Sequence, residues 1–430
     1  MASHDLVDSG KEDFDTKRRN ALAEIDNAKF GWFHVRTIVV TGVGFFTDAY
    51  DLFAVNFVTV MLGYVYYSSS KNALPTNLEL GIKISAQCGT FIGQLLFVIS
   101  SEFANKKRRG AMIGSVFAMQ GFGILAAAIM STILLAAYKP NIKDDRNVNQ
   151  ATEDIAVVLG RKERATTIEE EDVVRVEAPT QSWQDFKAYF GKWENGKILL
   201  GTSLSWFLLD IAFYGIGLNN SVILSNIGYA KDPDPFKTLW NLSIGNILIA
   251  VLGTVPGYWF TVALVDVWGR KPIQLMGFGV LTVLFLVLGV AYKQILKTST
   301  ALFIVIFTLC QFFQNFGPNT TTFIIPGEVF PTRYRSTGHG ISAASGKLGA
   351  IISQVGFLRL KDIGGKDAYV DKVIIIFAPI MFLGVLATLL IPETKNRSLE
   401  DLSNEKQVGF ISGVHHKPTG NTTKEIEAKS

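Results

Sequence analysis

Long apolar runs with few charges dominate this sequence. The hydrocarbon core of a bilayer is about 30 Å thick, and a helix needs about 20 apolar residues to cross it. Nine runs reach roughly that length, at about 37–66, 80–101, 110–138, 197–224, 241–264, 272–292, 300–326, 338–359 and 372–391. The sequence therefore predicts an all-α membrane protein with about nine spans.

Composition and charge agree with this prediction and argue against other classes. Of the 430 residues, 48% are hydrophobic and only 18% are charged, which is fewer charges than a soluble domain usually carries. A net charge of +4 without a long basic cluster does not suggest nucleic-acid binding. The two cysteines, Cys88 and Cys310, both lie inside apolar runs, where a thiol usually acts as a packing residue. We expect no disulfide framework, no thiolate zinc site and no cofactor.

Polar segments divide the chain. Residues 1–36 are expected to form a cytosolic tail, and they lack the apolar region of a cleavable signal peptide, so the first span should direct membrane insertion. Residues 139–196 predict a polar loop between two transmembrane bundles, 37–138 and 197–392. Within that loop, "QSWQDFKAYFGKW" is typical of a short amphipathic helix. Residues 393–430 are polar, and their composition predicts a disordered tail.

Two aspartates lie near the middle of the first run, in "GFFTDAYDLFAV". An ionised side chain at the centre of a membrane helix costs about 2.5–3.5 kcal/mol on insertion scales, so its presence indicates a functional site. Asp48 and Asp51 are three residues apart and therefore share one helix face. The alternative is a helix end with two solvated acids.

A third aspartate lies in "SLSWFLLDIAFYG". Trp206 precedes Asp210 by four residues and Tyr214 follows it by four, which places an indole, a carboxyl and a phenol on one helical stripe. Lys347 lies in "SAASGKLGAIIS", among small residues that permit close helix approach. The stripe could also be aromatic packing around a satisfied acid, and Lys347 could be a structural counter-ion for one of the aspartates.

The run at about 300–326 carries a second polar stripe. Gln311, Asn315 and Asn319 follow each other at four-residue spacing, and Gly317-Pro318 should break the helix among them. A broken helix at membrane depth is tolerated where it lines a cavity, so this pattern indicates a site. Gln120 adds an amide in the third run; its alternative role is a hydrogen bond between packed helices.

Together these residues predict a polar cavity able to hold a polar or anionic solute and to take up a proton on a carboxylate. The sequence contains no Ser-His-Asp set and no phosphate-cradling glycine loop before a helix, and all five histidines except His339 lie outside the apolar runs. We therefore expect a transporter-like protein and not an enzyme.

Several segments resemble one family, the proton-coupled inorganic phosphate transporters of fungi and plants in the major facilitator superfamily. The similar segments are "FFTDAYDLF", "SEFANKKRRGAMIGSVFAMQG", "SWFLLDIAFYG", "DVWGRKP", "QNFGPNTTTFIIPGEVFPTRYRSTGHGISAASGKLGA" and "PETKNRSLEDL". The resemblance extends over nearly all of residues 30–405. It implies a major facilitator fold, phosphate and protons as the transported partners, and a multi-pass location in the lipid bilayer, in the plasma membrane.

The resemblance also implies roles for individual residues. Those that match phosphate-binding positions of the family are Gln120, Trp206, Asp210, Tyr214 and Asn319, with Lys347 close to the substrate. Asp48 and Asp51 match the proton route of the family, which Asp210 shares. A proton on a carboxylate relieves its repulsion of phosphate, so each ligand should promote binding of the other, as symport requires.

The sequence also departs from this family. The family has twelve spans in two halves of six, and its fourth-span signature "GGDYPLS" is absent here. The second run begins like the family's second span and, between Phe97 and Ser101, continues like the end of its fourth span. We call this point the join. We therefore predict a complete six-helix C-terminal half and an N-terminal half that lacks about three helices. An odd number of preceding spans would place residues 139–196 outside the cell.

Two other functions stay open at this point. Alternating access by two rocking bundles needs comparable halves, so the shortened chain could be a non-transporting phosphate sensor or a partner that assembles with full-length copies. A weaker alternative is a transporter for a sugar or an organic anion. The aspartate at the centre of the stripe and the long segment around 314–350 favour phosphate over sugar.

Overall fold

The described part of the chain is helical throughout. A computed structural model describes residues 31–67, 74–94, 129, 183–331 and 334–397, and these contain no strand. The helices before the central gap are α2 (Trp32–Tyr66) and α3 (Thr76–Gln94). Those after it are α6 (Trp183–Phe190), α7 (Trp193–Gly217), α8 (Asn220–Asn226), α9 (Pro235–Ile249), η2 (Ala250–Thr254), α10 (Val255–Trp268), α11 (Arg270–Val290), α12 (Tyr292–Thr298), α13 (Thr300–Asn315), α14 (Pro318–Val329), α15 (Arg335–Leu360) and α16 (Val370–Leu389).

Seven described segments are long and apolar enough to cross a membrane. They are Ile38–Tyr66, Trp193–Gly217, Pro235–Trp268, Arg270–Val290, Thr300–Val329, Arg335–Leu360 and Val370–Leu389, and each overlaps one of the nine predicted runs. The second predicted run is described only in part, as α3, and the third, at about 110–138, lies outside the described residues apart from residue 129. The prediction of an all-α membrane protein is confirmed.

Two of these segments are interrupted, and a third break follows the end of the segment Trp193–Gly217. The segment Pro235–Trp268 contains the π-helical turn η2 just before Pro256, whose ring cannot donate the backbone hydrogen bond of a regular helix. The segment Thr300–Val329 breaks between α13 and α14 at Gly317-Pro318, so the break predicted there is confirmed. α7 ends at Gly217 and α8 starts at Asn220. All three interruptions lie beside polar side chains, as the next subsection describes.

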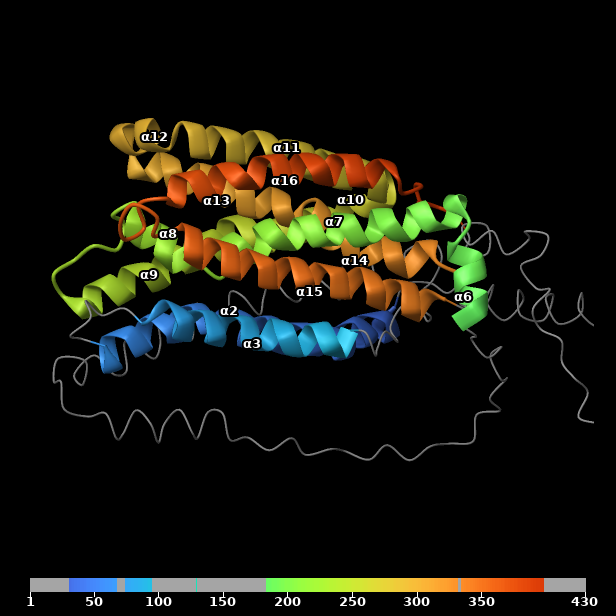
Figure 1. Ribbon diagram of the computed structural model, residues 1–430, viewed down its shortest axis with the longest axis horizontal. Helices are drawn as coiled ribbons and strands as arrows, with labels where there is room; N and C mark the ends of the chain where they lie inside the picture. The colour runs from blue at the N-terminus through green and yellow to red at the C-terminus, as the bar shows by residue number, and fades with distance from the viewer. Residues whose placement is uncertain (1–30, 68–73, 95–128, 130–182, 332–333, 398–430) are drawn as a thin grey trace, which may run out of the picture.

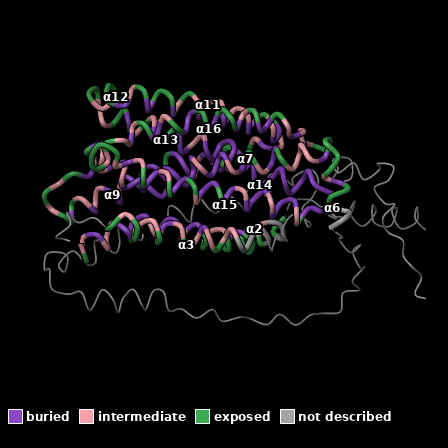
Figure 2. The backbone as a smooth tube through the Cα atoms, in the orientation of Figure 1, coloured by how far each residue is buried: buried purple, intermediate pink, exposed green. Residues whose placement is uncertain are grey.

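The helices run roughly parallel to one another in an elongated bundle (Figure 1). α2 and α3 lie side by side along one flank, α3 packs on α15, and α11 packs against α16 on the opposite flank. The buried residues follow the middle of the bundle, while exposed ones gather on its outer faces (Figure 2). Many exposed side chains are large and apolar, including Leu252, Val290 and Phe382 at 62%, 69% and 52% exposure. Such an apolar exterior suits a lipid environment.

An ionic cluster closes one end of the bundle. Arg270 Nη2 lies 2.9 Å from Glu328 Oε1 and Arg270 Nε donates to Glu328 Oε2 at 3.0 Å, while Arg270 Nη1 lies 2.9 Å from Asp266 Oδ1. Glu393 accepts hydrogen bonds from the backbone N–H groups of Arg270 and Lys271, each at 3.0 Å. Glu393 lies at the start of the predicted disordered tail, but these bonds hold it against the first turn of α11.

α15 approaches α7 closely because small residues line their contact. A Cβ added at Gly346 would lie 2.9 Å from Asp210 Oδ2, and one added at Gly349 would meet the backbone of Phe207. Thr202 and Ser342 hydrogen-bond across the same contact at 2.9 Å. The small residues around Lys347 therefore allow the polar groups of the two helices to meet in the middle of the bundle.

Candidate functional site

The stripe on α7 faces the interior of the bundle. Trp206, Asp210 and Tyr214 are 4%, 2% and 1% exposed, so all three side chains are buried. They lie on successive turns of an uninterrupted helix, because α7 continues to Gly217. α7 therefore presents an indole, a carboxyl and a phenol to one region, as their spacing predicts.

Lys347 of α15 meets two members of this stripe. Its Nζ donates a hydrogen bond to the Tyr214 hydroxyl at 2.5 Å and lies 3.7 Å from Asp210 Oδ2. The same ammonium group lies 4.3 Å from the centroid of the Tyr214 ring. A buried lysine and a buried aspartate thus face each other in membrane-spanning helices, an arrangement that usually marks a functional site.

The Asp210 carboxylate keeps hydrogen-bonding capacity. Its Oδ2 atom is buried and has no hydrogen-bond partner among the described residues, since Lys347 Nζ at 3.7 Å is beyond hydrogen-bond range. Buried polar atoms are almost always hydrogen-bonded, so an exception in a polar cluster needs an explanation. A proton, or a ligand hydroxyl that donates to this oxygen, would satisfy it.

The break between α13 and α14 contributes amides to the same region. Asn319, in the first turn of α14, donates through Nδ2 to the Tyr258 hydroxyl and to Asn315 Oδ1, both at 2.7 Å. Asn315 Nδ2 in turn donates to the backbone carbonyl of Gln311 at 2.7 Å. Tyr258 of α10 lies within electrostatic range of Asp210 and Tyr214. The amide ladder on α13 and α14 therefore ends beside the α7 stripe.

The first-run aspartates approach the site from α2. Both lie well inside a helix of 35 residues, so the alternative of a helix end is wrong. Asp48 lies within electrostatic range of Lys347 and Tyr214, although its side chain and that of Asp51 are exposed. Aromatic contacts fix the helix here: the Phe53 ring stacks on Tyr214 at 6.3 Å between centroids. Asp48 is thus near the central cluster.

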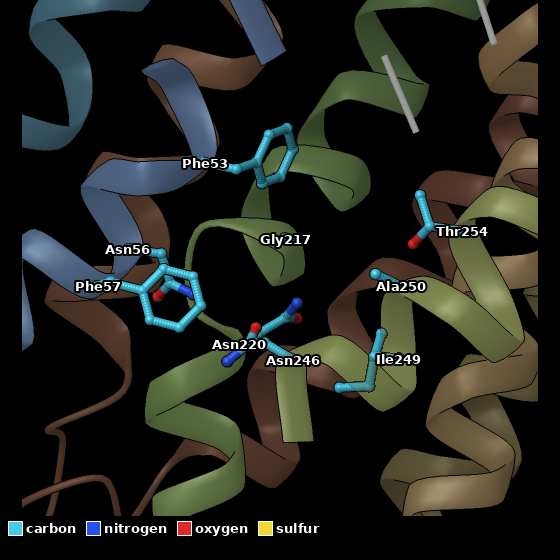
Figure 3. A pocket seen from close by; sticks show the side chains of 9 residues that line it. All are labelled: Phe53, Asn56, Phe57, Gly217, Asn220, Asn246, Ile249, Ala250 and Thr254. Carbon is cyan, nitrogen blue, oxygen red and sulfur yellow. The ribbon is translucent and has the colours of Figure 1, made fainter. Parts of the chain in front are cut away.

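A small pocket lies beside this cluster (Figure 3). Its polar walls come from three asparagines and a threonine, and its apolar walls include two phenylalanines: Asn56, Asn220, Asn246, Thr254, Phe53 and Phe57. The π-helical turn η2 forms one side of it. Asn220 Oδ1 accepts a hydrogen bond from Gln311 Nε2 at 3.3 Å, which links the pocket wall to the amide ladder.

Comparisons with known proteins place the chain in a family. Residues 141–405, more than half of the chain, match the model of the family described as "Sugar (and other) transporter". The "Repressible high-affinity phosphate permease" of Neurospora crassa is 39% identical over 92% of this chain and 90% of its own. "Inorganic phosphate transporter 1-2" of Oryza sativa is 36% identical over 90% of this chain and 97% of its own. This chain belongs to the phosphate transporter family of the major facilitator superfamily.

A solved structure gives a weaker likeness. The proton:xylose symporter XylE, bound to 6-bromo-6-deoxy-D-glucose, has a TM-score of 0.48 and 13% sequence identity, with 87% of each chain covered. The sequence matches carry the family assignment. Because that family consists of multi-pass membrane proteins, the apolar outer faces of the seven long helices are the lipid-facing surface.

Two candidate features lie beyond what the structure describes. Gln120 falls in the stretch 95–128, and so does the predicted join at Phe97 to Ser101. The remaining predicted residues come from four places: Asp48 and Asp51 on α2, the α7 stripe, Lys347 on α15, and Asn319 on α14. Within the described ranges, no three His, Cys, Asp or Glu side chains gather as metal ligands would.

Sequence reasoning missed two residues of this cluster. Tyr258 is fully buried and bonded to Asn319, but it lies in an apolar run without a polar stripe of its own. Gly346 lies against Trp206 and Asp210, and a side chain there would collide with both. The Pro-Gly pair just before Tyr258 was the available signal, since such a pair in a span often marks a distorted helix beside a cavity.

Proposed function

We propose that this protein transports inorganic phosphate across the plasma membrane together with protons, by alternating access. One observation carries the proposal: a buried carboxylate with an unpartnered oxygen, on Asp210, faces the Lys347 ammonium in the middle of two membrane-spanning helices. The names of relatives at 36% to 39% identity support phosphate as the substrate.

The proposed coupling follows from the charges at this pair. When Asp210 is ionised, it neutralises Lys347 and repels an anion; when it carries a proton, the ammonium charge of Lys347 is free to attract phosphate. Proton and phosphate then favour each other's binding, and the reciprocity of linked equilibria makes this true in both directions. We assign Asp48, which interacts electrostatically with Lys347, and Asp51, one turn further along α2, to the route by which the proton reaches Asp210.

The remaining predicted residues would hold the anion itself. Phosphate oxygens accept hydrogen bonds from an indole N–H, a phenol, an amide and an ammonium group, and these are the groups that Trp206, Tyr214, Asn319 and Lys347 carry. Gln120 supplies a further amide in this proposal. Their neutral donors surround a single cation, which suits a singly charged, partly protonated phosphate.

Phosphate uptake tests the proposal. The full chain should be expressed in a cell without its own phosphate transporters, and uptake of labelled phosphate measured with and without a protonophore. We expect uptake that the protonophore suppresses. Excess sulfate and excess xylose should compete poorly, whereas strong competition by xylose would favour the sugar alternative.

Asp210→Asn gives the sharpest variant. It keeps the shape of the side chain but removes its charge and its protonation, so we expect uptake to fall to background while the protein still reaches the membrane. Glu194→Gln is the matched control: it makes the same chemical change on the same helix, at an exposed position in the first turn of α7. Full uptake by Asp210→Asn would remove Asp210 from the site.

A second candidate is a non-transporting membrane protein, either a phosphate sensor or a partner of full-length copies. The observation that favours it is the length of the alignments, 519 and 517 positions for the two relatives above, against 430 residues in this chain. The relatives therefore contain positions that have no counterpart here.

Two experiments test this candidate. Protein at the cell surface that binds phosphate without uptake would support it. A tag near Arg164 would report on which side of the membrane the central loop lies.

A further inference from the structure

The break after α7 lies one turn beyond Tyr214. α7 ends at Gly217 and α8 begins at Asn220, and the regular helical pattern changes here. The Leu218 N–H still donates to the carbonyl of Tyr214 at 3.2 Å, but the Asn219 N–H donates to the carbonyl of Ile216 at 2.9 Å and no longer to that of Gly215. Two side-chain amides also bond to carbonyls beside the break: Gln354 Nε2 donates to the carbonyl of Tyr214 at 2.6 Å, and Asn219 Nδ2 donates to the carbonyl of Gly215 at 2.8 Å. The backbone that carries the Tyr214 phenol is therefore held by these two amides.

A buried lysine from another part of the chain holds the amides. Lys83 of α3 donates from Nζ to Asn219 Oδ1 at 2.8 Å and to Glu79 Oε1 at 2.6 Å. Asn219 Nδ2 also donates to Gln354 Oε1 at 3.2 Å, which joins the two amides. Lys83, Asn219 and Gln354 are 2%, 0% and 0% exposed. We call Lys83, Glu79, Asn219 and Gln354 the Lys83 cluster.

Both charged members of the Lys83 cluster lie on α3. The carboxylate that neutralises Lys83 belongs to Glu79, four residues earlier on the same helix, so the ion pair moves with α3. The contact that crosses to α8 and α15 is made with a neutral amide. α3 can therefore leave the C-terminal bundle without breaking the ion pair between Lys83 and Glu79, whereas Asn219 would lose one of its partners.

We propose that Lys83 is a positioning residue for the site around Tyr214. Through Asn219 and Gln354 it holds the hinge, which we define as residues 214–220 at the junction of α7 and α8. The contact of α3 with the C-terminal bundle therefore sets the position of Tyr214. Docking of α3 orders the hinge and fixes the phenol against Lys347. Departure of α3 releases both. The consequence for phosphate affinity rests on the proposed function, but the effect on the hinge does not.

Hydrogen exchange at the hinge tests the structural half of this inference. Amides of residues 214–220 should be followed by mass spectrometry in the purified full chain, comparing wild type with Lys83→Met. We expect exchange at these residues to become several-fold faster, with α11 and α16 unchanged. Arg359→Ala is the matched control, because Arg359 Nη2 also bonds to α3: it donates to Asn77 Oδ1 at 3.0 Å, but on the exposed surface. Equal exchange in Lys83→Met and wild type would overturn the inference.

A double-mutant cycle tests the functional half. Affinity for inorganic phosphate should be measured on purified protein for wild type, Lys83→Met, Tyr214→Phe and the double variant. We expect Lys83→Met to weaken binding about tenfold in the wild-type background and hardly at all beside Tyr214→Phe, since coupled residues are non-additive. Equal losses in both backgrounds would show that Lys83 does not act through Tyr214.

Two further variants keep the test decisive. Gln354→Leu breaks the same chain from α15, so it should reproduce the faster exchange if Lys83→Met does not fold. Lys83→Arg keeps a charged donor and should restore part of the phosphate affinity. If wild type binds no phosphate, the proposed function fails, and the exchange experiment still decides whether Lys83 holds the hinge.

Discussion

The two ends of the described bundle use buried cations in different ways. At one end, Arg270 contacts both carboxylate oxygens of Glu328, and Thr394 donates to the same carboxylate at 2.6 Å. At the other end, Lys83 faces a carboxylate on its own helix and bonds to Asn219 before α8. The first arrangement joins helices of one bundle by opposite charges; the second joins α3 to that bundle by a neutral contact.

This difference teaches which contact should persist during transport. Separating Arg270 from Glu328, which is fully buried, would leave a charge without its partner in the interior. Moving α3 away carries its ion pair along. We therefore expect the Arg270 end to stay assembled while the Lys83 end opens, and the predictions below are ordered by how strongly they test that contrast.

Arg270→Ala should have the largest effect on stability. It removes the guanidinium that contacts both oxygens of the buried Glu328, and breaking one side of a buried pair costs about 3 kcal/mol or more. Thermal unfolding of the purified protein in detergent measures this loss of stability. The double variant Arg270→Ala with Glu328→Gln should recover part of the loss, because no buried charge is then left behind. A melting temperature equal to wild type would show that this end is not held by charge.

Gly269→Ala should lower the free energy of unfolding by a smaller amount, roughly 1–3 kcal/mol. Gly269 has φ +103°, a conformation that side chains disfavour, and a Cβ there would lie 2.7 Å from Glu393 Oε2. The substitution should therefore displace the carboxylate that accepts from the first two N–H groups of α11. Gly279→Ala, inside α11 with open space where its Cβ would lie, is the control and should unfold like wild type.

Lys361, just after α15, should show the smallest effect and a defined pH dependence. Burial lowers the pKa of Lys361, but the carboxylates of Asp367 and Asp362 outweigh burial and hold its pKa above the ordinary 10.5. A raised folded pKa means that this stabilisation is complete below about pH 10.5 and is lost as the pH rises through the folded value. Lys361→Met should thus lower the free energy of unfolding by roughly 1.5 kcal/mol at neutral pH.

Unfolding curves at several pH values check this prediction. The difference between wild type and Lys361→Met should be constant from pH 7 to about 10 and should shrink above the ordinary lysine pKa. A difference that grows with pH would contradict the assignment of the stabilisation to the charged ammonium. Phosphate binding at neutral pH should be the same in both proteins, which separates this lysine from Lys83.

Much of the fold and part of the site followed from local patterns. Bilayer thickness sets the length of a span, so seven of the predicted runs could be located without any knowledge of packing. Helical spacing placed Trp206, Asp210 and Tyr214 on one face, and the missing N–H of Pro318 predicted the break before α14. These properties depend on residues within a few turns of each other.

Only the tertiary structure decided which distant groups meet. Nothing near Lys347 in the chain indicates that its ammonium bonds the Tyr214 hydroxyl, or that Tyr258 caps the amide ladder. The same holds for Lys83. Its position one helical turn after Glu79 predicts an ion pair within α3, but the sequence does not indicate that its ammonium also bonds to Asn219 beside the end of α7. The sequence by itself determined which polar groups lie in the membrane; helix packing decided their partners, because pairing across helices depends on the approach of backbones far apart in the chain.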